Sequence, residues 1–448
     1  MTTLIIKDNT TRDQKDFSQI PLLTAKIADK ALSQLEQTGV FVLPETIGHS
    51  DDLEADQMVL QSDKQTYRAS NVMGFLGIND EQLMIQSRFA TAKQDYFFQY
   101  LLEKTLDMPN ITNFNTRLNP SERIFDLYTF LFPRYLKNAM RKGLFKTYVW
   151  RHYNNQNVKG IIDIKRHILL NTPFAGNVAF KQREFSFDND MTQLIRHTIE
   201  FIKIKSFGKS VLQQVQDEIS QIIAVTSSYQ YFDRQKVIAD NQQNPIQHAY
   251  YQEYRDLQRL CLRILQHDKH NIGIGINQIN GILFDGAWLW ESYIAKLIDD
   301  EFYHPKNKTG KGTQQLFSLE NGKQIGRIYP DFISKNIENR VIADTKYKPM
   351  SNIGNKDYLQ VLAYMFRFNA QAGYYIYPEQ DHTSKLAHKM FLNEGTTFDK
   401  NVMPRKDISV TKLGFQIPES QGISYSEFTD RIRMSEINFI QSLCKRPV

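Results

Sequence analysis

Cysteine is nearly absent from this chain. Its 448 residues include only two, Cys261 and Cys444. Two thiols exclude a disulfide framework, a four-cysteine zinc site and an iron–sulfur cluster held by cysteine alone. A chain so poor in cysteine suits a reducing compartment, and we therefore expect a cytoplasmic protein.

Long hydrophobic runs are absent as well. No stretch approaches the roughly 20 consecutive apolar residues that a membrane span requires. The first residues, MTTLIIKDNTTRDQKD, place acids and polar residues directly after a short apolar run, which does not resemble a secretory signal. These two absences lead us to expect a soluble protein with no membrane as a partner.

The chain also lacks an extreme charge or composition. Lys and Arg number 55 against 49 Asp and Glu, a formal net charge of +6, which permits a nucleic acid as partner without requiring one. The hydrophobic share of 41% and the charged share of 23% lie in the globular range and exclude wholesale disorder. A length of 448 residues predicts two or three domains.

A nucleotide-binding loop is the last absence. Gly208-Lys209-Ser210 resembles the end of a phosphate loop, but position 203 is Lys where the leading glycine should stand. The sequence pattern also lacks the strand that precedes such a loop. We therefore expect no nucleotide site in this chain, and any energy-driven step must come from another subunit.

The first part of the chain shows a β pattern. Residues 72–78 (VMGFLGI) and 82–89 (QLMIQSRF) flank the turn Asn79-Asp80, which predicts a β-hairpin. Residues 37–90 as a whole look rich in strands, and the pattern changes to helical spacing at Gln94. The sequence therefore predicts a β-rich module over residues 1–105.

Helical spacing dominates the next part, residues 106–275. One helix is predicted over residues 122–148, kinked or broken at Pro133, and residues 157–168 predict a strand. Further helices follow, up to a polar segment with several glycines. We place the main boundary of the chain in that segment, near residue 275.

The last part, residues 276–448, alternates helices and strands. In order, the pattern predicts a helix over 284–303, strands over 326–334 and 339–347, a helix over 357–370 and a strand over 373–378. Helix, strand, strand, helix, strand is an α/β unit built on a mixed sheet. The expected fold class is therefore α/β, with an α+β region preceding a mixed sheet that is flanked by helices.

Two acids in this last part can meet at one place. Asp331 belongs to the only Pro-Asp dipeptide of the chain, and Asp344-Thr345-Lys346 begins 13 residues later, on the next predicted strand. Asp344 and Lys346 project from the same face of that strand because they are two residues apart. Two carboxylates suit Mg²⁺, which polarises a phosphodiester and lowers the pKa of a bound water. Lys346 can orient that water and stabilise charge on the phosphoryl oxygens.

The tripeptide of an acid, any residue and a lysine is short and occurs three times. It begins at Asp13, Asp163 and Asp344. Asp13 lies in a polar segment, and residues 134–162 upstream of Asp163 contain no carboxylate that could share a metal. Only Asp344 combines a strand with an upstream acid. The alternative is a surface hairpin with an incidental Asp–Lys pair.

Two flanking features favour a site. Glu291 lies in the preceding helix beside an apolar face, where a carboxylate needs a metal or a hydrogen-bond donor; the alternative is a solvated Glu on the polar side. Gln360 and Tyr364 are four residues apart in the following helix and share a face. They can contact a DNA backbone or orient the lysine, and the alternative for them is ordinary packing.

Together these residues resemble the PD-(D/E)xK nuclease core in its RecB-like form, which carries a helix Glu, the PD and DxK strands and a following QxxxY helix. The resemblance implies a DNA nuclease that depends on Mg²⁺, with Mn²⁺ as an alternative. The catalytic residues that it implies are Glu291, Asp331, Asp344, Lys346, Gln360 and Tyr364, of which Asp331 and Asp344 are the metal ligands. Some members of this group bind an iron–sulfur cluster through four cysteines, which this chain cannot do.

A basic stretch lies in the middle of the chain. Residues 134–166 hold nine Lys and Arg against one acid, Asp163, and aromatic residues interleave with them. The basic groups could neutralise phosphates while the aromatics stack, they could dock on an acidic partner, or they could form a solvated helix face. The candidate DNA- or partner-binding residues are Arg141, Lys142, Lys146, Arg151 and Lys159.

Several stretches between about residue 70 and residue 380 resemble McrC, the nuclease subunit of McrBC-type modification-dependent restriction systems. They are residues 74–89, 141–168 and 185–202, followed by LFDGAWLWESYIAKL and PDF…ADTKYK in the second half. Ser87-Arg88 stands where that family often has Pro-Lys. The first 70 residues and the tail after residue 380 match nothing recognisable.

The McrC resemblance implies an endonuclease subunit of a restriction system that defends against phage. It implies a McrB-like AAA+ GTPase ring as partner, which residues 106–275 would bind and whose GTP hydrolysis the N-terminal half would stimulate. Residues 276–448 would be the nuclease domain. Two other interpretations stay open at this point: a self-sufficient RecB-like nuclease without a motor, and a non-catalytic adaptor that uses a decayed nuclease fold to activate the GTPase.

Overall fold

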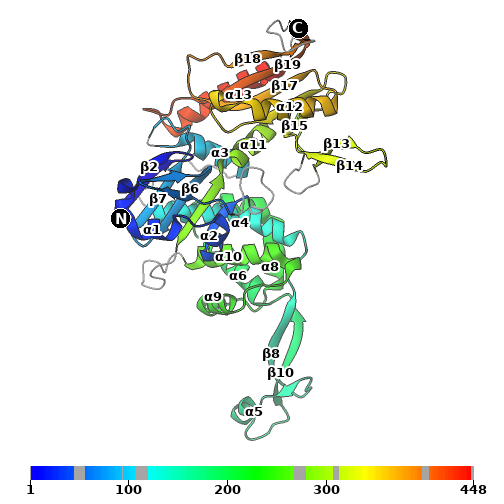
Figure 1. The fold of residues 1–448 in the computed structure, drawn as a ribbon. Coiled ribbons are helices and arrows are strands. Elements are labelled where there is room, and N and C mark those ends of the chain that lie inside the picture. The colour runs from blue at the N-terminus through cyan, green and yellow to red at the C-terminus, as the bar shows by residue number, and fades with distance from the viewer. Residues whose placement is uncertain are drawn as a thin grey trace. The chain divides into compact units, whose positions relative to one another are not determined.

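The computed structural model describes most of the chain in two compact units. The described residues are 2–44, 56–92, 94–106, 120–266, 279–305, 312–395 and 403–444. One unit combines Met1–Ile124 with Ile276–Val448, and the other is Phe125–Gly275. Figure 1 shows the elements of both units as a mixed α/β architecture. Among the described residues, no helix is both long enough and apolar enough to span a membrane.

The first unit begins with a five-stranded sheet, called the N-terminal sheet below, in the order β1-β7-β6-β11-β3. Its strands are β1 (Thr2–Lys7), β3 (Val40–Leu43), β6 (Val72–Ile78), β7 (Glu81–Gln86) and β11 (Asn280–Asp285). The antiparallel pair β6–β7 confirms the predicted hairpin. The strand β11 comes from the far side of the predicted boundary near residue 275, so the two parts of the chain share this sheet. The three-part division of the chain stays a prediction.

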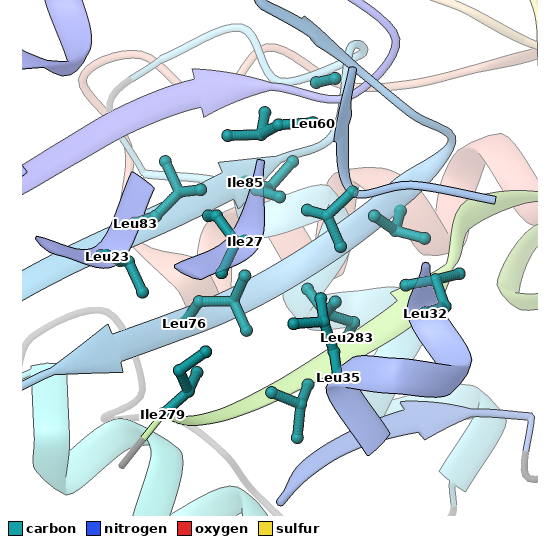
Figure 2. Close-up of a cluster of buried hydrophobic side chains, with 14 of the residues drawn as sticks. Leu23, Ile27, Leu32, Leu35, Leu60, Leu76, Leu83, Ile85, Ile279 and Leu283 are labelled. Carbon is teal, nitrogen blue, oxygen red and sulfur yellow. The ribbon is translucent and has the colours of Figure 1, made fainter. Parts of the chain in front are cut away.

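Two short helices, α1 (Pro21–Ile27) and α2 (Leu32–Thr38), pack on the N-terminal sheet. Figure 2 shows Leu23 and Leu35 of these helices in one buried cluster with Leu76 of β6 and Leu283 of β11. Burial of such side chains contributes roughly 1.5–3 kcal/mol each. Apolar burial therefore ties β11, and the segment that follows it, to the N-terminal sheet.

Close contact between β6 and β11 depends on one glycine. Gly74 has a φ of 144°, and a Cβ at this position would overlap the carbonyl oxygen of Ile282. Only glycine adopts this conformation without strain.

A small three-stranded sheet, in the order β2-β5-β4, is formed by the first 70 residues. Its strands are β2 (Thr11–Asp13), β4 (Leu60–Asp63) and β5 (Thr66–Ala69).

A larger sheet in the same unit has six strands, in the order β12-β15-β16-β17-β19-β18. They are β12 (Phe302–Tyr303), β15 (Phe332–Ser334), β16 (Val341–Thr345), β17 (Ala372–Glu379), β18 (Ala387–Glu394) and β19 (Met403–Gln416). The pairs β16–β17 and β17–β19 are parallel and the other pairs are antiparallel. The sheet is therefore mixed, as predicted.

Three helices accompany this mixed sheet: α11 (Gly286–Leu297), α12 (Asn355–Phe368) and α13 (Tyr425–Cys444). Val361 and Met365 of α12 pack with Ile342 of β16 and Tyr375 of β17 in a buried cluster. The Tyr375 hydroxyl donates a hydrogen bond of 2.7 Å to the Asp357 carbonyl oxygen. Helix α12 is therefore fixed against β17 and against β16, the strand that carries Asp344.

The prediction of a single strand over residues 326–334 is wrong. β14 (Gln324–Ile328) pairs with β13 (Gln314–Ser318) in a separate hairpin, and β15 begins only at Phe332. Pro330 lies between β14 and β15, and a proline has no N–H to donate to a sheet. The Pro-Asp dipeptide therefore occupies a connection, which leaves Asp331 outside the regular ladder.

Helices form most of the second unit. They are α4 (Pro120–Met140), α6 (Asp190–Lys203), α7 (Gly208–Leu212), α8 (Gln216–Val225), α9 (Arg234–Gln243) and α10 (Gln252–Gln266). Of the predicted kink or break at Pro133, the break is wrong, since α4 runs through this residue. The kink stays a prediction. Loss of the proline hydrogen bond costs about 3 kcal/mol, and the buried neighbours Phe132 and Leu136 offset that loss by packing.

The second unit also contains an arm, defined here as residues 147–186. It consists of β8 (Thr147–Asn155), β9 (Ile161–Ile162), α5 (Ile164–Leu170) and β10 (Val178–Ser186), with β8 and β9 both antiparallel to β10. In Figure 1 the β8–β10 pair extends from the helices of its unit and carries α5 at its far end.

Two predictions for this region are wrong. The helix predicted to reach residue 148 ends at Met140, and residues 157–168 form only a two-residue strand before a helix begins. Gly143, with a φ of 82°, follows the end of α4 and terminates helical geometry at low cost. Asp163 caps α5, because its Oδ1 accepts the Arg166 backbone N–H at 3.2 Å.

Candidate active site

Two acids, the buried Asp344 and the partly buried Asp331, meet at the end of β16. The Asp344 side chain is 1% exposed and lies on the strand itself. The next residue, Thr345, donates two hydrogen bonds of 2.8 Å to Asp331 Oδ2, one from its backbone N–H and one from its hydroxyl. The connection between β14 and β15 therefore delivers the Asp331 carboxylate to the residue that adjoins Asp344, as the sequence predicted for these two acids.

Lys346 lies between this acid pair and helix α12. Its Nζ is 2.7 Å from Asp344 Oδ2 and 3.7 Å from Asp357 Oδ1, and it donates a hydrogen bond of 3.2 Å to Gln360 Oε1. Gln360 in turn donates from Nε2 to the Tyr364 hydroxyl at 2.7 Å. The structure therefore brings Lys346, Gln360 and Tyr364 into one hydrogen-bonded chain, and Lys346 forms an ion pair with Asp344.

Electrostatics in this cluster are strongly perturbed. Burial, followed by repulsion from Glu291, raises the pKa of Asp331 to about 7. Burial, followed by repulsion from Asp331, raises the pKa of Asp344 to about 7. Burial opposes the charged form of Lys346, but Asp344 and Asp331 outweigh this effect and raise its pKa above the ordinary value. Lys346 therefore stays charged. Its single positive charge does not balance the charged forms of both Asp331 and Asp344.

Glu291 approaches the same cluster from helix α11. Asp285 caps this helix by accepting the Ala287 backbone N–H at 2.9 Å. Glu291 Oε1 is 3.8 Å from His304 Nε2, and His304 Nδ1 is 3.0 Å from the Asp331 carbonyl oxygen. Glu291 is therefore not fully solvated, because His304 lies close both to it and to the loop that carries Asp331.

His304 is a residue that sequence reasoning missed. It follows β12, and its ring stacks on Phe332 with 5.0 Å between the ring centroids. No motif spacing marks it, because its neighbours at the site come from other strands and from α11. Only the pairing of β12 with β15 brings it beside Asp331.

A cavity of about 840 Å³ contains these groups. All six residues predicted to be catalytic line it: Glu291, Asp331, Asp344, Lys346, Gln360 and Tyr364. Asn9, Asn71 and Arg88, which adjoin strands of the N-terminal sheet, line it too. Sequence reasoning missed these three, because more than 200 residues separate them from the rest of the site.

The donor set fits a hard divalent cation in part. Among the described residues, no group of three or more His, Cys, Asp and Glu side chains is arranged to hold a metal ion. The pair Asp331 and Asp344 supplies two carboxylates, and Mg²⁺ is commonly bound through one or two carboxylates together with water and substrate phosphates. Burial first, and repulsion from a neighbouring acid second, raise the pKa of both acids, and a bound cation would favour their charged forms.

The predicted basic residues do not line this cavity; they belong to the second unit. Lys142 Nζ is 2.6 Å from Glu253 Oε2, and Arg151 Nη2 is 3.3 Å from Asp188 Oδ2. Lys146 Nζ lies over the ring of Phe187 at 4.6 Å. Arg141 lies just past α4, and Lys159 is exposed in the arm. Several of these cations are therefore engaged with local partners. Part of the stretch forms β8 and β9 and not a helix, and what its basic residues bind stays a prediction.

Apolar exposure distinguishes the arm more than its charge does. Helix α5 has no buried residue. Ten large apolar side chains of the arm are each more than half exposed: Tyr148, Trp150, Ile161, Ile162, Ile164, Ile168, Leu169, Leu170, Phe174 and Phe185. Monomeric proteins rarely expose a large contiguous apolar surface unless a partner covers it.

Comparison with known proteins adds the family. A sequence model of the family described as McrBC 5-methylcytosine restriction system component matches residues 67–378. No curated protein matches the chain significantly in sequence.

Two solved structures from Thermococcus gammatolerans are similar in part. One is a chain of the refined half-complex from a tetradecameric assembly of McrB AAA+ hexamers with bound McrC. It is 13% identical with a TM-score of 0.47, over 98% of this chain and 100% of that chain. The other, a chain of the cryo-EM structure of the McrBC complex, is 13% identical with a TM-score of 0.31, over 66% of this chain and 87% of that chain.

Proposed function

The chain belongs to the family of McrBC 5-methylcytosine restriction system components, and from this premise we propose that it is the nuclease subunit of such a system. It hydrolyses DNA phosphodiester bonds at the cavity that contains Asp331, Asp344 and Lys346. One observation carries this proposal: residues from a loop, a strand and two helices converge in one cavity, where two acids lie beside a charged lysine. This is the arrangement that the PD-(D/E)xK resemblance implies.

The roles follow from the geometry. Asp331 and Asp344 would hold Mg²⁺, or Mn²⁺ in its place, and the bound ion would supply Lewis-acid polarisation of the phosphodiester. Lys346, aligned by Gln360 and Asp344, places a positive charge beside the acids, where it can orient the attacking water and stabilise the phosphoryl oxygens. Tyr364 holds Gln360 in the orientation that receives the lysine.

The partner in this proposal is a McrB-like AAA+ GTPase ring. The chain has no phosphate loop, and the helix α6, rather than a strand, precedes Gly208-Lys209-Ser210. The exposed apolar surface of the arm supports a protein as its occupant, because a DNA backbone would require exposed cations and not leucines and isoleucines. We assign the arm to the contact with the ring and to stimulation of its GTP hydrolysis.

Two alternatives make different predictions. A self-sufficient nuclease would cut DNA with Mg²⁺ alone and would leave the apolar arm without an occupant. A non-catalytic adaptor would activate the GTPase without cutting. The convergence of all six candidate catalytic residues in one cavity disfavours the adaptor, since a decayed site has no need to retain them.

One experiment separates the three. Methylated and unmethylated plasmids are incubated with the purified chain and Mg²⁺, with and without a McrB-like ring and GTP, and both cleavage and GTP turnover are measured. We expect cleavage of methylated plasmid only when ring and GTP are both present, together with faster GTP turnover. Efficient cutting by the chain alone would favour the self-sufficient nuclease, and faster turnover without any cutting would favour the adaptor.

A further inference from the structure

The N-terminal sheet reaches into the candidate active site through Arg88. This residue follows β7, and its side chain, which is 13% exposed, lines the cavity that also contains Asp344 and Lys346. Nothing in the proposed mechanism uses it. Its position raises the question of what a guanidinium at this wall would bind.

A fully buried acid, Asp8, binds Arg88 on the side away from the cavity. Its Nε donates to Asp8 Oδ2 at 2.9 Å, its Nη2 donates to the same oxygen, and its backbone N–H donates to Asp8 Oδ1. Asn71 Oδ1 also accepts from Nη2. Asp8 is 0% exposed and does not line the cavity. The pair is thus oriented, with its negative end in the core and its positive end toward the cavity.

Contacts with Tyr347 fix the position of Arg88 relative to Lys346 and the acids of the cavity. Its guanidinium lies over the ring of Tyr347 at 4.9 Å, and Tyr347 directly follows Lys346. The Tyr347 hydroxyl is 2.6 Å from Ser87 Oγ, and Phe89 packs edge-on against the same ring at 5.1 Å. Three consecutive residues after β7 therefore contact the residue after the candidate catalytic lysine.

We propose that Arg88 is a phosphate-binding residue of the candidate active site, which contacts the DNA backbone beside the scissile bond. This inference rests on the proposed nuclease function and names a substrate contact that the N-terminal sheet supplies. Arginine has five N–H donors in a rigid fork, and the bonds to Asp8 and Asn71 engage only Nε and Nη2. A guanidinium that is fixed in advance loses little conformational entropy when it binds phosphate.

Charge balance supports an added cation at this wall. Lys346 is engaged by Asp344, and Lys348 is 2.8 Å from Asp357 Oδ2. Arg327 and Lys356 also line the cavity. Arg88 adds a cation on the wall that the N-terminal sheet supplies, and this cation offsets part of the repulsion between the cavity acids and a polyanion. The competing interpretation is that Arg88 only joins the ends of β1 and β7 as a structural ion pair.

The test measures DNA binding by fluorescence anisotropy, with the full chain, a short duplex and EDTA to prevent cleavage, over a series of salt concentrations. The variant is Asp8→Asn with Arg88→Gln, which leaves the net charge unchanged and avoids an unpaired buried charge. The matched control is Arg405→Gln with Asp407→Asn, an exposed ion pair of 2.6 Å in the same unit that does not line the cavity.

The slope of log K against log salt is the decisive readout. We expect Kd to rise about tenfold at low salt and the slope to fall by about 0.9, the value of one lost phosphate contact. The control should match the wild type. A folded Asp8→Asn/Arg88→Gln variant with wild-type Kd and slope would overturn the inference and leave Arg88 a structural residue.

A second variant keeps the test decisive if the first does not fold. Asn9→Asp places a carboxylate on the same cavity wall, and Asp tolerates the φ of 52° found there. It should raise Kd at least threefold, and an unchanged Kd would overturn the inference. If the wild-type chain neither binds nor cuts DNA even with its ring and GTP, the proposed function itself fails. Normal binding and cutting with unaffected variants would sink only the role of Arg88.

Discussion

The candidate active site and the arm depart from ordinary protein surfaces in opposite ways. The site buries charge: Asp344 is 1% exposed, and burial raises the pKa of both acids to about 7. The arm exposes apolar surface, with Leu169 72% exposed and no buried residue in α5. A buried charge and an exposed apolar surface both cost free energy unless a bound ion or another molecule compensates them.

The difference indicates two kinds of missing partner. Negative charge in a cavity is compensated by bound cations, whereas exposed leucine and isoleucine side chains are covered by another protein surface. One region is therefore suited to chemistry and the other to assembly. If one region catalyses and the other assembles, substitutions in one region should leave the function of the other unchanged.

The largest expected effect is on cleavage. Asp344→Ala removes one of the two proposed metal ligands, and a loss of about 4 kcal/mol of transition-state stabilisation corresponds to about a 10³-fold slower reaction. GTP turnover by a McrB-like ring should be stimulated as in the wild type, because the arm is intact. Plasmid cleavage and phosphate release measure the two outcomes.

The matched control for that variant is Asp13→Ala, since Asp13 also stands two residues before a lysine but is exposed on β2. It should cut at the wild-type rate. A fully active Asp344→Ala variant would remove Asp344 from the site. Loss of GTPase stimulation in the same variant would show instead that the two regions are not separable.

The second prediction concerns the arm. The double substitution Ile164→Glu and Leu169→Glu removes two exposed apolar side chains at about 1.5 kcal/mol each, which weakens assembly with the ring about 100-fold. The thermal midpoint of the chain alone should stay within about 2 °C, because neither side chain is buried. Analytical ultracentrifugation and GTP turnover are the measurements.

Ile204→Glu is the control for the arm, since Ile204 is 73% exposed in the same unit but lies outside residues 147–186. It should assemble normally. If the arm variant still assembles and stimulates, the apolar surface has another occupant, and the basic residues Arg141 and Lys142 become the better candidates for the partner contact.

The third prediction is a pH dependence with a definite sign. The folded chain without metal holds protons on Asp331 and Asp344 up to about pH 7, whereas the unfolded chain releases them near pH 4. These two groups therefore stabilise the fold at low pH, and this contribution is lost as the pH rises toward and through 7. Melting temperatures measured in EDTA should fall from pH 5 to pH 8, and Mg²⁺ should raise them at pH 8 but not at pH 5.

Asp344→Asn tests the origin of that slope. The variant should melt with a smaller dependence on pH and with little response to Mg²⁺. A residual slope is expected from Asp95, because burial also raises the pKa of that acid to about 7. An unchanged slope and an unchanged response to Mg²⁺ would show that the acid pair is not the metal site.

The smallest effect is expected at the edge of the site. Tyr364→Phe removes the hydroxyl that accepts the hydrogen bond from Gln360, so Gln360 is less firmly aligned with Lys346. One hydrogen bond contributes about 0.5–1.5 kcal/mol, which predicts a rate two- to tenfold lower with unchanged DNA binding. Tyr358→Phe, on the same helix but bonded to the Ile353 carbonyl oxygen, should leave the rate unchanged.

Local patterns explain how far sequence reasoning reached. The hairpin β6–β7, the strand β16 and the helices α11 and α12 were accessible, because each depends on alternation or on spacing within a few residues. The set of six candidate catalytic residues came from the resemblance to the PD-(D/E)xK core, and their catalytic roles stay a prediction. The same reasoning failed where a neighbour in space decided the outcome. Pro133 lies within a helix because Phe132 and Leu136 are buried, and residues 326–334 are divided because Pro330 cannot join a sheet.

Arg88 and His304 mark the limit most clearly. The sequence by itself determined that two acids and a lysine would share one strand end, because side chains two residues apart point the same way and a short connection returns the chain. Tertiary structure alone decided which distant residues complete that site. Strand β11 pairs with β6, and β12 pairs with β15. These pairings bury apolar area between segments far apart in the chain, so no spacing pattern in the sequence records them.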